Sequence, residues 1–234
     1  MIVMKDVLVE KGGIFSLHIP ELVFAAGEHH IIIGASGSGK STLLKSALGM
    51  ERLKRGSVRM FEGKESFDMD LANTRGRIYL LSQENALWPH MSVIQHIRFV
   101  LNRGNPFKKH ELEESILEAF SLVGERSLKP SSLSWGQRRK LSLARAVAAD
   151  PEFLFLDEPF ANIDMVQAKE LSDMLYRACA ERGSCIVQVT HYPILPPNLK
   201  SIILLENGQA VSKSSVEEIG GCSDWSRMWT GMVK

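Results

Sequence analysis

The sequence predicts an α/β fold with a predominantly parallel sheet, an N-terminal antiparallel β subdomain and an inserted α-helical subdomain. Three observations lead to this fold class. Short apolar runs that fit buried strands alternate along the chain with stretches of helical periodicity. A loosely alternating pattern precedes the first of these runs. Between Glu84 and Asp150 the spacing of apolar residues lengthens towards the helical period of about 3.6 residues.

The composition indicates a soluble globular chain with enough apolar residues for a sizeable core. Its 234 residues are 44% hydrophobic and 24% charged, which is ordinary for such proteins. The net charge is +1 without a basic block, so there is no electrostatic case for nucleic-acid binding. The longest apolar runs are too short to span a membrane. The three cysteines do not have the spacing of a metal site, and the sequence shows no secretory signal. We therefore expect reduced thiols in a cytoplasmic protein: Cys179, Cys185 and Cys222.

The first third of the chain predicts strands followed by a loop and a helix. Apolar residues on both sides of a Gly12-Gly13 turn predict an antiparallel hairpin: Val3, Val7, Val9, Phe15, Leu17 and Ile19. His29–Ile33 predicts a buried strand, the glycine-rich segment 34–39 a loop, and residues 41–48 a helix that Gly49 ends. Residues 78–81 predict another short strand.

The middle segment predicts helices. One helical face carries Leu112, Ile116, Leu117, Phe120 and Val123. A second helix follows Pro130, bears Leu141, Ala144, Val147 and Ala148, and ends at Asp150-Pro151.

The remainder returns to alternating strands and helices. It predicts a strand at 153–156, a helix at 166–180, a strand at 185–189 and a hairpin around Asn207-Gly208. We therefore expect a single domain over 1–234, with a nucleotide-binding core from 1–83 and 151–234 and a helical subdomain from 84–150.

The loop after the first buried strand matches the phosphate-binding pattern G-x-x-x-x-G-K-[ST]. Its glycines allow backbone N–H groups to converge on phosphate, and the helix N-terminus adds partial positive charge. Lys40 can reach the β- and γ-phosphates, and the Ser41 hydroxyl can ligate Mg²⁺. An ordinary flexible turn would leave both residues unexplained. The predicted phosphate-binding residues are Gly34, Ala35, Ser36, Gly37, Ser38, Gly39, Lys40, Ser41 and Thr42.

Two carboxylates follow the apolar strand in "FLFLDEP". Neighbouring strand residues point to opposite faces, so Asp157 and Glu158 can take different roles. Asp157 is expected to hold Mg²⁺ through a water molecule, and Glu158 to act as the general base towards the attacking water. Alone, the segment would be read as a polar turn; the upstream phosphate loop favours a P-loop NTPase (RecA-like) core.

His191 follows the next apolar strand in "VTHYP". Ligands bind beyond the carboxyl ends of strands in open α/β sheets. His191 could therefore hydrogen-bond the γ-phosphate and hold Glu158 and water in place. The alternative is an ordinary surface histidine.

The segment "LSWGQ" predicts a capped helix start that could also bind an anion. Ser134 and Gln137 fit a capping box, and a helix N-terminus attracts phosphate. One nucleotide does not need two such sites from one subunit. A second copy related by a two-fold axis would make each nucleotide site composite.

Taken together and in this order, the motifs resemble those of ABC transporter nucleotide-binding subunits of the solute-importer type. "GASGSGKST" resembles the Walker A loop, Gln83 in "LLSQENALWPHMSV" the Q-loop glutamine, and "LSWGQ" the signature LSGGQ. "FLFLDEP" resembles Walker B, Asp164 in "ANID" the D-loop aspartate, and His191 the switch histidine.

The resemblance implies an ATP hydrolase in which two subunits, here expected as a homodimer, sandwich two ATP molecules. Glu158, His191, Lys40 and Gln83 would be catalytic, and Ser41, Gln83 and Asp157 would hold Mg²⁺. The partner's nucleotide would be contacted by Ser134, Gly136, Gln137 and Asp164. Trp135 stands at the first signature glycine; we expect its indole to point away from phosphate, since otherwise ATP would bind but hydrolyse poorly. Phe15 is either an adenine-stacking residue or a core residue.

The resemblance also implies a transmembrane permease subunit as partner, with the chain on the cytoplasmic face of the cell membrane. Residues 88–91 lie where such a partner would dock, although they could instead pack on their own domain. A solute-binding protein is a further expected component, and among solute importers the sequence is most similar to thiamine-type systems. An exporter ATPase, a non-transport ABC ATPase and a nucleotide kinase are the alternatives.

Overall fold

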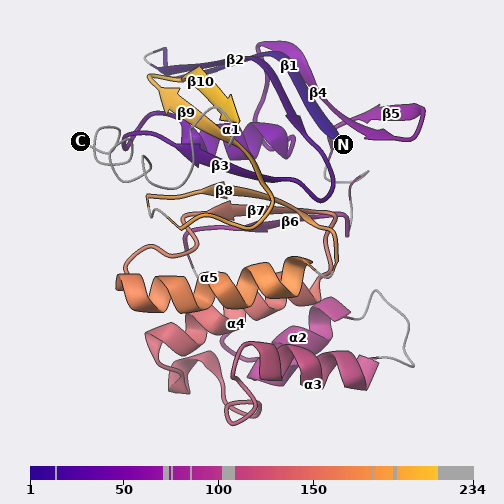
Figure 1. Cartoon of the computed structure of the whole chain (residues 1–234), viewed down its shortest axis with the longest axis vertical. Coiled ribbons are helices and arrows are strands. Elements are labelled where there is room, and N and C mark those ends of the chain that lie inside the picture. The colour runs from indigo at the N-terminus through magenta and orange to yellow at the C-terminus, as the bar shows by residue number, and fades with distance from the viewer. Residues whose placement is uncertain are drawn as a thin grey trace.

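The protein, seen in a computed structural model, builds one ten-stranded sheet with helices on both sides (Figure 1). The structure describes residues 1–13, 15–70, 74, 76–84, 86–101, 109–180, 182–191 and 194–215. The strand order is β5-β4-β1-β2-β10-β9-β3-β8-β7-β6. The fold class predicted from the sequence is confirmed, since one half of this sheet is antiparallel and the other parallel.

The antiparallel half comes from the N-terminal part of the chain. β1 (Ile2–Lys11) pairs with β2 (Phe15–Phe24), which confirms the predicted hairpin. β1 also pairs with β4 (Arg55–Glu62), and β4 pairs with β5 (Glu65–Asp68). The last two strands were not predicted. They lie at the edge of the sheet, where their few apolar residues alternate with charged ones.

The parallel half holds the most apolar strands. β9 (Leu199–Glu206), β3 (His29–Ile33), β8 (Cys185–Val189), β7 (Phe153–Asp157) and β6 (Ile78–Leu81) run side by side in the same direction. Every residue of β3 and β8 is buried, because elements cover both faces, and such strands read as continuous apolar runs. The carboxyl ends of β3, β7 and β8 therefore meet at one edge.

The turn between β9 and β10 (Gln209–Ser215) is the predicted hairpin at Asn207-Gly208. Gly208 accepts a hydrogen bond from the His18 amide at 2.7 Å and donates one to the Ser38 carbonyl at 3.0 Å. This turn thus connects the antiparallel strands to the loop that follows β3.

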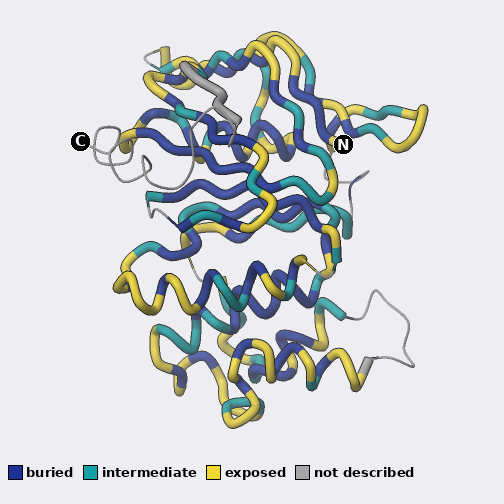
Figure 2. The backbone as a smooth tube through the Cα atoms, viewed as in Figure 1, coloured by how far each residue is buried: buried dark blue, intermediate teal, exposed yellow. Residues whose placement is uncertain are grey.

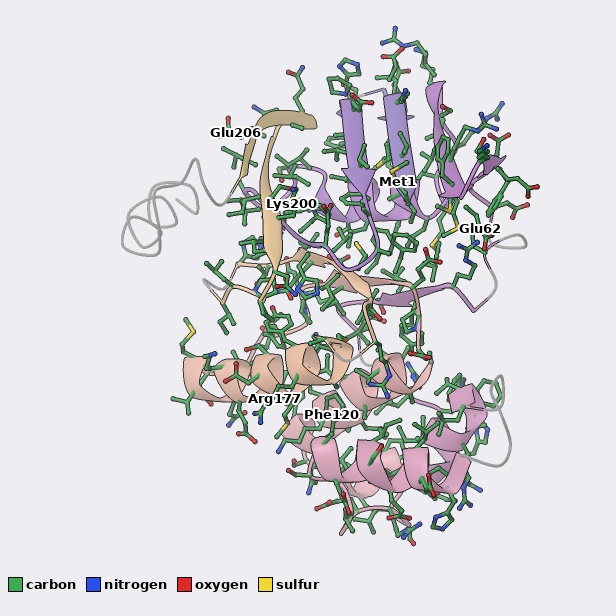
Figure 3. The ribbon with its side chains drawn as sticks, turned by 45° about the vertical axis from the view of Figure 1, so that its right-hand side comes forward. Met1, Glu62, Phe120, Arg177, Lys200 and Glu206 are labelled. Carbon is green, nitrogen blue, oxygen red and sulfur yellow. The ribbon has the colours of Figure 1, made fainter. Side chains whose placement is uncertain are left out.

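The helices divide between the two sides of the parallel strands. Figure 1 shows α1 (Lys40–Ala47) enclosed between the antiparallel and parallel strands. On the opposite side lie α5 (Met165–Ala180), α4 (Trp135–Ala148), α2 (Val93–Leu101) and α3 (Lys109–Ala119), with a short 3₁₀ turn η2 (Pro130–Ser132) before α4. In Figure 3, Met1 and Glu62 mark the antiparallel end of the molecule, and Phe120 and Arg177 the helical end.

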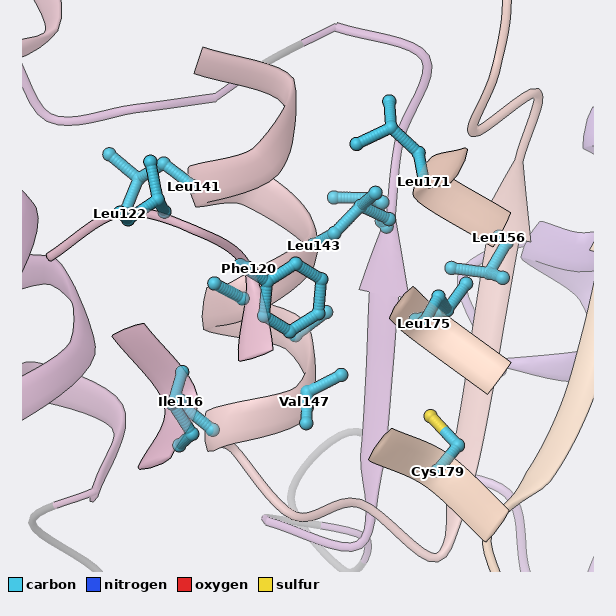
Figure 4. Packing of buried hydrophobic residues seen from close by; sticks show 14 of the residues in the cluster. Ile116, Phe120, Leu122, Leu141, Leu143, Val147, Leu156, Leu171, Leu175 and Cys179 are labelled. Atoms are coloured by element: carbon cyan, nitrogen blue, oxygen red, sulfur yellow. The ribbon is translucent and has the colours of Figure 1, made fainter. Parts of the chain in front are cut away.

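Two large hydrophobic clusters fill the two sides of the sheet, and the central strands β3 and β8 are buried throughout (Figure 2). One cluster joins α1 to the antiparallel strands. The other joins Phe120, Leu141 and Val147 from the helical segment to Leu156 of β7 and Leu175 of α5 (Figure 4). The helical segment therefore has no separate core; it shares one with β7 and α5.

The single helical face predicted between residues 112 and 123 is wrong in part. Ile116, Leu117 and Phe120 are buried, but Leu112 and Val123 are 38% and 44% exposed. The reason is that α3 ends at Ala119 and the chain turns there, so Val123 does not continue the same face.

The cysteines within the described chain are buried. Cys179 and Cys185 are free thiols, and burial raises the pKa of both, that of Cys179 to about 12. Cys222 lies outside the described residues.

Candidate functional site

The phosphate loop lies between β3 and α1, as the sequence predicts. Gly34, Gly37 and Gly39 have φ angles of 155°, 79° and 105°. A Cβ atom at Gly34 would lie 2.2 Å from the Leu205 carbonyl oxygen. The loop is therefore held against β9 by a contact that only glycine permits, and α1 begins directly after it at Lys40.

Lys40 is buried and its ammonium group bonds to its own loop. Its Nζ donates to the carbonyl oxygens of Gly34 and Ala35, each at 2.8 Å. Burial lowers the pKa of Lys40, while the charges of Glu158 and Asp157 act in the opposite direction. The ammonium group is thus held above the loop, close to both carboxylates.

The two carboxylates stand at the carboxyl end of β7. Burial raises the pKa of Asp157, and a hydrogen bond with the Ser41 side chain offsets part of that rise. Glu158 has a φ of 48°, a left-handed conformation that is uncommon outside glycine. Its amide donates to the Val189 carbonyl oxygen of β8 at 3.0 Å.

His191 lies beside Glu158. The distance from His191 Nε2 to Glu158 Oε1 is 3.0 Å, and both side chains are partly exposed. The structure thus brings together two residues that lie 33 positions apart in the sequence, at the edge where β7 and β8 end.

A cavity of about 420 Å³ lies between the phosphate loop and Glu158, and neither Asp157 nor His191 is among the described residues that line it. It is lined by the phosphate loop together with Gln83, Glu158 and Phe15. Phe15 also packs against the buried hydrophobic cluster beneath it. Its ring lies against the loop as well, since a Cβ atom at Gly39 would be 2.7 Å from it. Its role in stacking on adenine stays a prediction. Lys11 lines the same cavity and was not predicted, because an exposed lysine at the end of a strand carries no sequence signature.

The turn at 134–137 lies on a different cavity, of about 670 Å³, shared with Asp164. The predicted capping box is confirmed: Ser134 accepts from the Gln137 amide, and the Gln137 side chain accepts from the Ser134 amide. Gln137 Nε2 also donates to Glu125 at 2.8 Å. Asp164 accepts hydrogen bonds from two amides in the first turn of α5, those of Val166 and Gln167.

The predicted nucleotide-binding residues therefore form two groups in one chain. The phosphate loop, Gln83 and Glu158 line one cavity, and Ser134, Gly136, Gln137 and Asp164 line the other. Trp135 is 40% exposed and lines the second cavity. That its indole avoids phosphate stays a prediction.

Arg139 is a buried charge beside these groups that sequence reasoning missed. Its side chain donates to the main-chain carbonyl oxygens of Gln83 and Glu158. Burial lowers its pKa to about 10, which leaves it charged at neutral pH. The available signal was its position on α4, four residues before the buried Leu143.

The segment predicted to contact a partner is partly packed on its own domain. Trp88 is half-buried and stacks on His96 at 5.4 Å between ring centroids, and the Arg145 guanidinium lies 4.7 Å from the Trp88 ring centroid. Phe99 meets Trp88 edge-on at 4.9 Å yet remains 54% exposed. An apolar cavity of about 400 Å³ adjoins these rings.

His96 holds this segment in place as a neutral imidazole. Its Nε2 accepts a hydrogen bond from the Trp88 amide at 2.9 Å, so the proton must be on Nδ1, which lies 2.8 Å from the Ser92 carbonyl oxygen. Burial is the main cause that lowers the pKa of His96, and the neighbouring charges of Arg145 and His90 lower it further.

Stability should consequently fall as the pH drops. A histidine whose folded pKa is lowered binds fewer protons in the native than in the unfolded state, so its contribution is complete above about pH 6.5 and is lost as the pH falls towards the folded pKa. Burial lowers the pKa of His29 as well. We expect a lower free energy of unfolding at pH 5.5 than at pH 7.5 in denaturant titrations. The free energy of unfolding should depend less on pH in His96→Gln and in His29→Gln than in the wild type. The same pH dependence in both variants as in the wild type would contradict the role of these histidines.

Within the described ranges, no helix combines the length and the apolar character that a membrane crossing requires.

Comparison with known proteins agrees with this geometry. The family described as ABC transporter matches residues 17–161, more than half of the chain. The thiamine import ATP-binding protein ThiQ of Histophilus somni is 33% identical over 201 residues, which cover 85% of this chain and 92% of ThiQ. The sulfate/thiosulfate import ATP-binding protein CysA of a Synechocystis species is 33% identical over 221 residues, which cover 93% of this chain but 61% of CysA.

Solved structures show the same fold. The dimeric, post-hydrolysis structure of the ATP-binding cassette MJ0796 bound to ADP and Pi has a TM-score of 0.77 at 26% identity, and the match covers 92% of this chain and 99% of that one. An ATP-binding subunit of an ABC transporter matches with a TM-score of 0.79 at 20% identity, over 98% of this chain and 99% of that one. The ordered motifs, the geometry of the phosphate loop and these similarities lead to one conclusion: the chain belongs to the ABC transporter family.

Proposed function

We propose that this protein is the ATP-binding and ATP-hydrolysing subunit that energises an ABC importer. The observation that carries the proposal is one cavity lined by the phosphate loop, Gln83 and Glu158, with His191 3.0 Å from the Glu158 carboxylate. ThiQ and CysA, whose names describe import ATP-binding proteins, support the importer assignment.

The residues divide the work of hydrolysis between them. The loop amides and Lys40 bind the phosphates, and Glu158 accepts the proton of the attacking water. His191 orients Glu158 and the water, and contacts the γ-phosphate. Ser41, Gln83 and Asp157 offer the oxygen ligands that Mg²⁺ prefers, and the contact between Ser41 and Asp157 brings two of them together. Mg²⁺ held there would neutralise charge on the phosphates.

A second subunit completes each nucleotide site. The 134–137 turn and Asp164 line a cavity apart from the phosphate loop of the same chain. This separation supports a role for them at another chain's nucleotide, as expected when two copies face each other about a two-fold axis. The dimeric MJ0796 structure supports this arrangement.

The transport partner is a transmembrane permease subunit that docks on the surface around Trp88 and Phe99. A half-exposed aromatic pair beside an apolar cavity fits a buried anchor of a protein interface. Docking there places the chain on the cytoplasmic face of the membrane, and a solute-binding protein would deliver the cargo. The relatives named above import different solutes, in keeping with cargo selection by the other subunits.

Lys40→Ala tests the nucleotide site. Loss of the ammonium group should weaken ATP binding by about 1.5–3 kcal/mol, which is roughly 10- to 150-fold in Kd. Titration with a fluorescent ATP analogue measures this. Lys169→Met, which removes an exposed lysine on α5 paired with Asp173, is the charge-matched control and should bind as the wild type does. Equal affinities in the two variants would contradict the assignment.

Phe99→Asp tests the permease surface. A charge in place of an exposed aromatic anchor should abolish co-purification of the integral membrane subunit from native membranes, while ATP binding by the isolated chain is unchanged. Met50→Asp alters a similarly exposed apolar residue just after α1 (47% against 54%) and should retain the subunit. Retention by Phe99→Asp would place the docking surface elsewhere.

A further inference from the structure

Arg139 is a fully buried arginine that joins three segments of the proposed catalytic site. It is 1% exposed and lies in the first turns of α4, just after the 134–137 turn. Nη2 donates to the Glu158 carbonyl oxygen at 2.8 Å, and Nε donates to the carbonyl oxygen of Pro159. Nη1 reaches the Gln83 carbonyl oxygen at a longer 3.4 Å.

These acceptors belong to the two segments that surround the reacting water in the proposed mechanism. The Glu158 carbonyl is the main-chain group of the general base itself. Gln83 supplies a side-chain oxygen towards Mg²⁺, and its main-chain oxygen faces Arg139. A guanidinium is a rigid planar fork with five donors, so its bonds fix the relative positions of its acceptors better than a flexible ammonium could.

The backbone at Glu158 needs such support. Its φ of 48° is a conformation that a non-glycine residue holds only where its surroundings impose it. On the amide side, Glu158 donates to the Val189 carbonyl of β8. On the carbonyl side it accepts from the Ala161 amide at 3.2 Å and from Arg139. Arg139 is the only side chain among these three contacts, and it comes from the helix that bears the 134–137 turn.

We propose that Arg139 is a positioning residue for ATP hydrolysis, which fixes the main chain of Glu158 relative to Gln83 and to the helix that follows the 134–137 turn. This inference rests on the proposed function of Glu158 and adds a residue that does not itself touch nucleotide or water. A displacement of the α4 N-terminus would be transmitted to the Glu158 carboxylate through this one guanidinium. Contact of the turn with a second subunit's nucleotide is thereby coupled to the geometry of the base.

The test compares steady-state ATP hydrolysis by Arg139→Gln, Arg139→Lys and the wild type. Arg139→Gln should lower kcat by roughly 10- to 100-fold and leave KM for ATP unchanged, because the phosphate loop is untouched. Arg139→Lys keeps the charge and should recover part of kcat. Arg77→Gln is the control, because Arg77 also donates several hydrogen bonds, to Glu152 and Glu62. Arg77 stands just before β6, at the amino ends of the parallel strands and away from Glu158. Its kcat should equal that of the wild type.

A double-mutant cycle separates positioning from general packing. If Arg139 acts through Glu158, Arg139→Gln should cost little further activity in a Glu158→Gln background. Additive losses, a wild-type kcat in Arg139→Gln, or equal falls in kcat for Arg139→Gln and Arg77→Gln would each overturn the proposal.

Hydrogen exchange provides a readout that does not depend on hydrolysis. The amides of Glu158 and Ala161 should exchange faster in Arg139→Lys than in the wild type, while those of β3 should not change. Unchanged exchange at 158 and 161 would overturn the inference even if all variants hydrolyse ATP. Absence of hydrolysis in the wild type would instead refute the proposed function, and exchange would still decide the role of Arg139. If Arg139→Gln does not fold, Arg139→Lys decides both measurements.

Discussion

Glu158→Gln is expected to reduce ATP hydrolysis by about 10²- to 10⁴-fold, the contribution of a positioned general base. Glutamine has nearly the same shape as glutamate, so the contact with His191, now 3.0 Å, can persist. The amide cannot accept the proton of the attacking water, and the chemical step should fail while ATP binding remains.

The same variant should accumulate as an ATP-bound dimer, because the two subunits close on nucleotide that is not consumed. Phosphate release measures the rate, and size-exclusion chromatography with Mg-ATP measures the dimer. The control is Glu21→Gln, which removes an exposed carboxylate on β2 that is 3.9 Å from Lys5. It should hydrolyse ATP normally and show the same proportions of monomer and dimer as the wild type. Normal turnover by Glu158→Gln would show that the base is another group.

Gly208→Ala, in the β9–β10 turn, is expected to destabilise the protein much more than an alanine at Gly63 in the β4–β5 turn. A Cβ atom at Gly208 would lie 1.8 Å from the Ser16 carbonyl oxygen, at a φ of 77°. Both the backbone conformation and the close approach to β2 oppose a side chain, and we expect a loss of about 3–5 kcal/mol in the free energy of unfolding.

Gly63→Ala is the matched comparison for that substitution. Gly63 lies in the β4–β5 turn with a φ of 58°, and no atom lies within 4 Å of an added Cβ. Alanine there should cost about 1–2 kcal/mol, the backbone cost alone. Urea unfolding measures both variants. Because Gly208 also bonds to the Ser38 carbonyl, ATP affinity should fall only in Gly208→Ala. Equal destabilisation by the two changes would contradict the close packing at Gly208.

The parts of the fold that could be predicted are those where local pattern and burial agree. β3, β7 and β8 consist mainly of apolar residues because helices and strands cover both of their faces. The loop between β3 and α1 could be predicted from its glycines and Lys40, since the chemistry of phosphate binding fixes their spacing. β4 and β5 could not, because an edge position permits charged residues at most places.

The candidate site shows a similar division. Glu158 and His191 each follow a recognisable strand, so their meeting at one edge follows from a parallel sheet. Arg139 acts through Gln83, which lies 56 positions away in the sequence, and nothing in its local pattern specifies that acceptor. Lys11 lies far in the sequence from Gln83 and Glu158, which line the same cavity. The end of α3 at Ala119 was also missed, because the apolar spacing continues past the turn.

The two hydrogen bonds that the Lys40 ammonium group donates to carbonyl oxygens have a consequence for turnover. A buried ammonium group that loses an anionic ligand would normally be left with a large unsatisfied charge. Lys40 has the oxygens of Gly34 and Ala35 within 2.8 Å, so departure of a phosphate group requires only a short swing back to neutral acceptors of its own loop. If Lys40 binds phosphate as proposed, product would leave without the loop unfolding, and the next triphosphate would have only to displace uncharged acceptors.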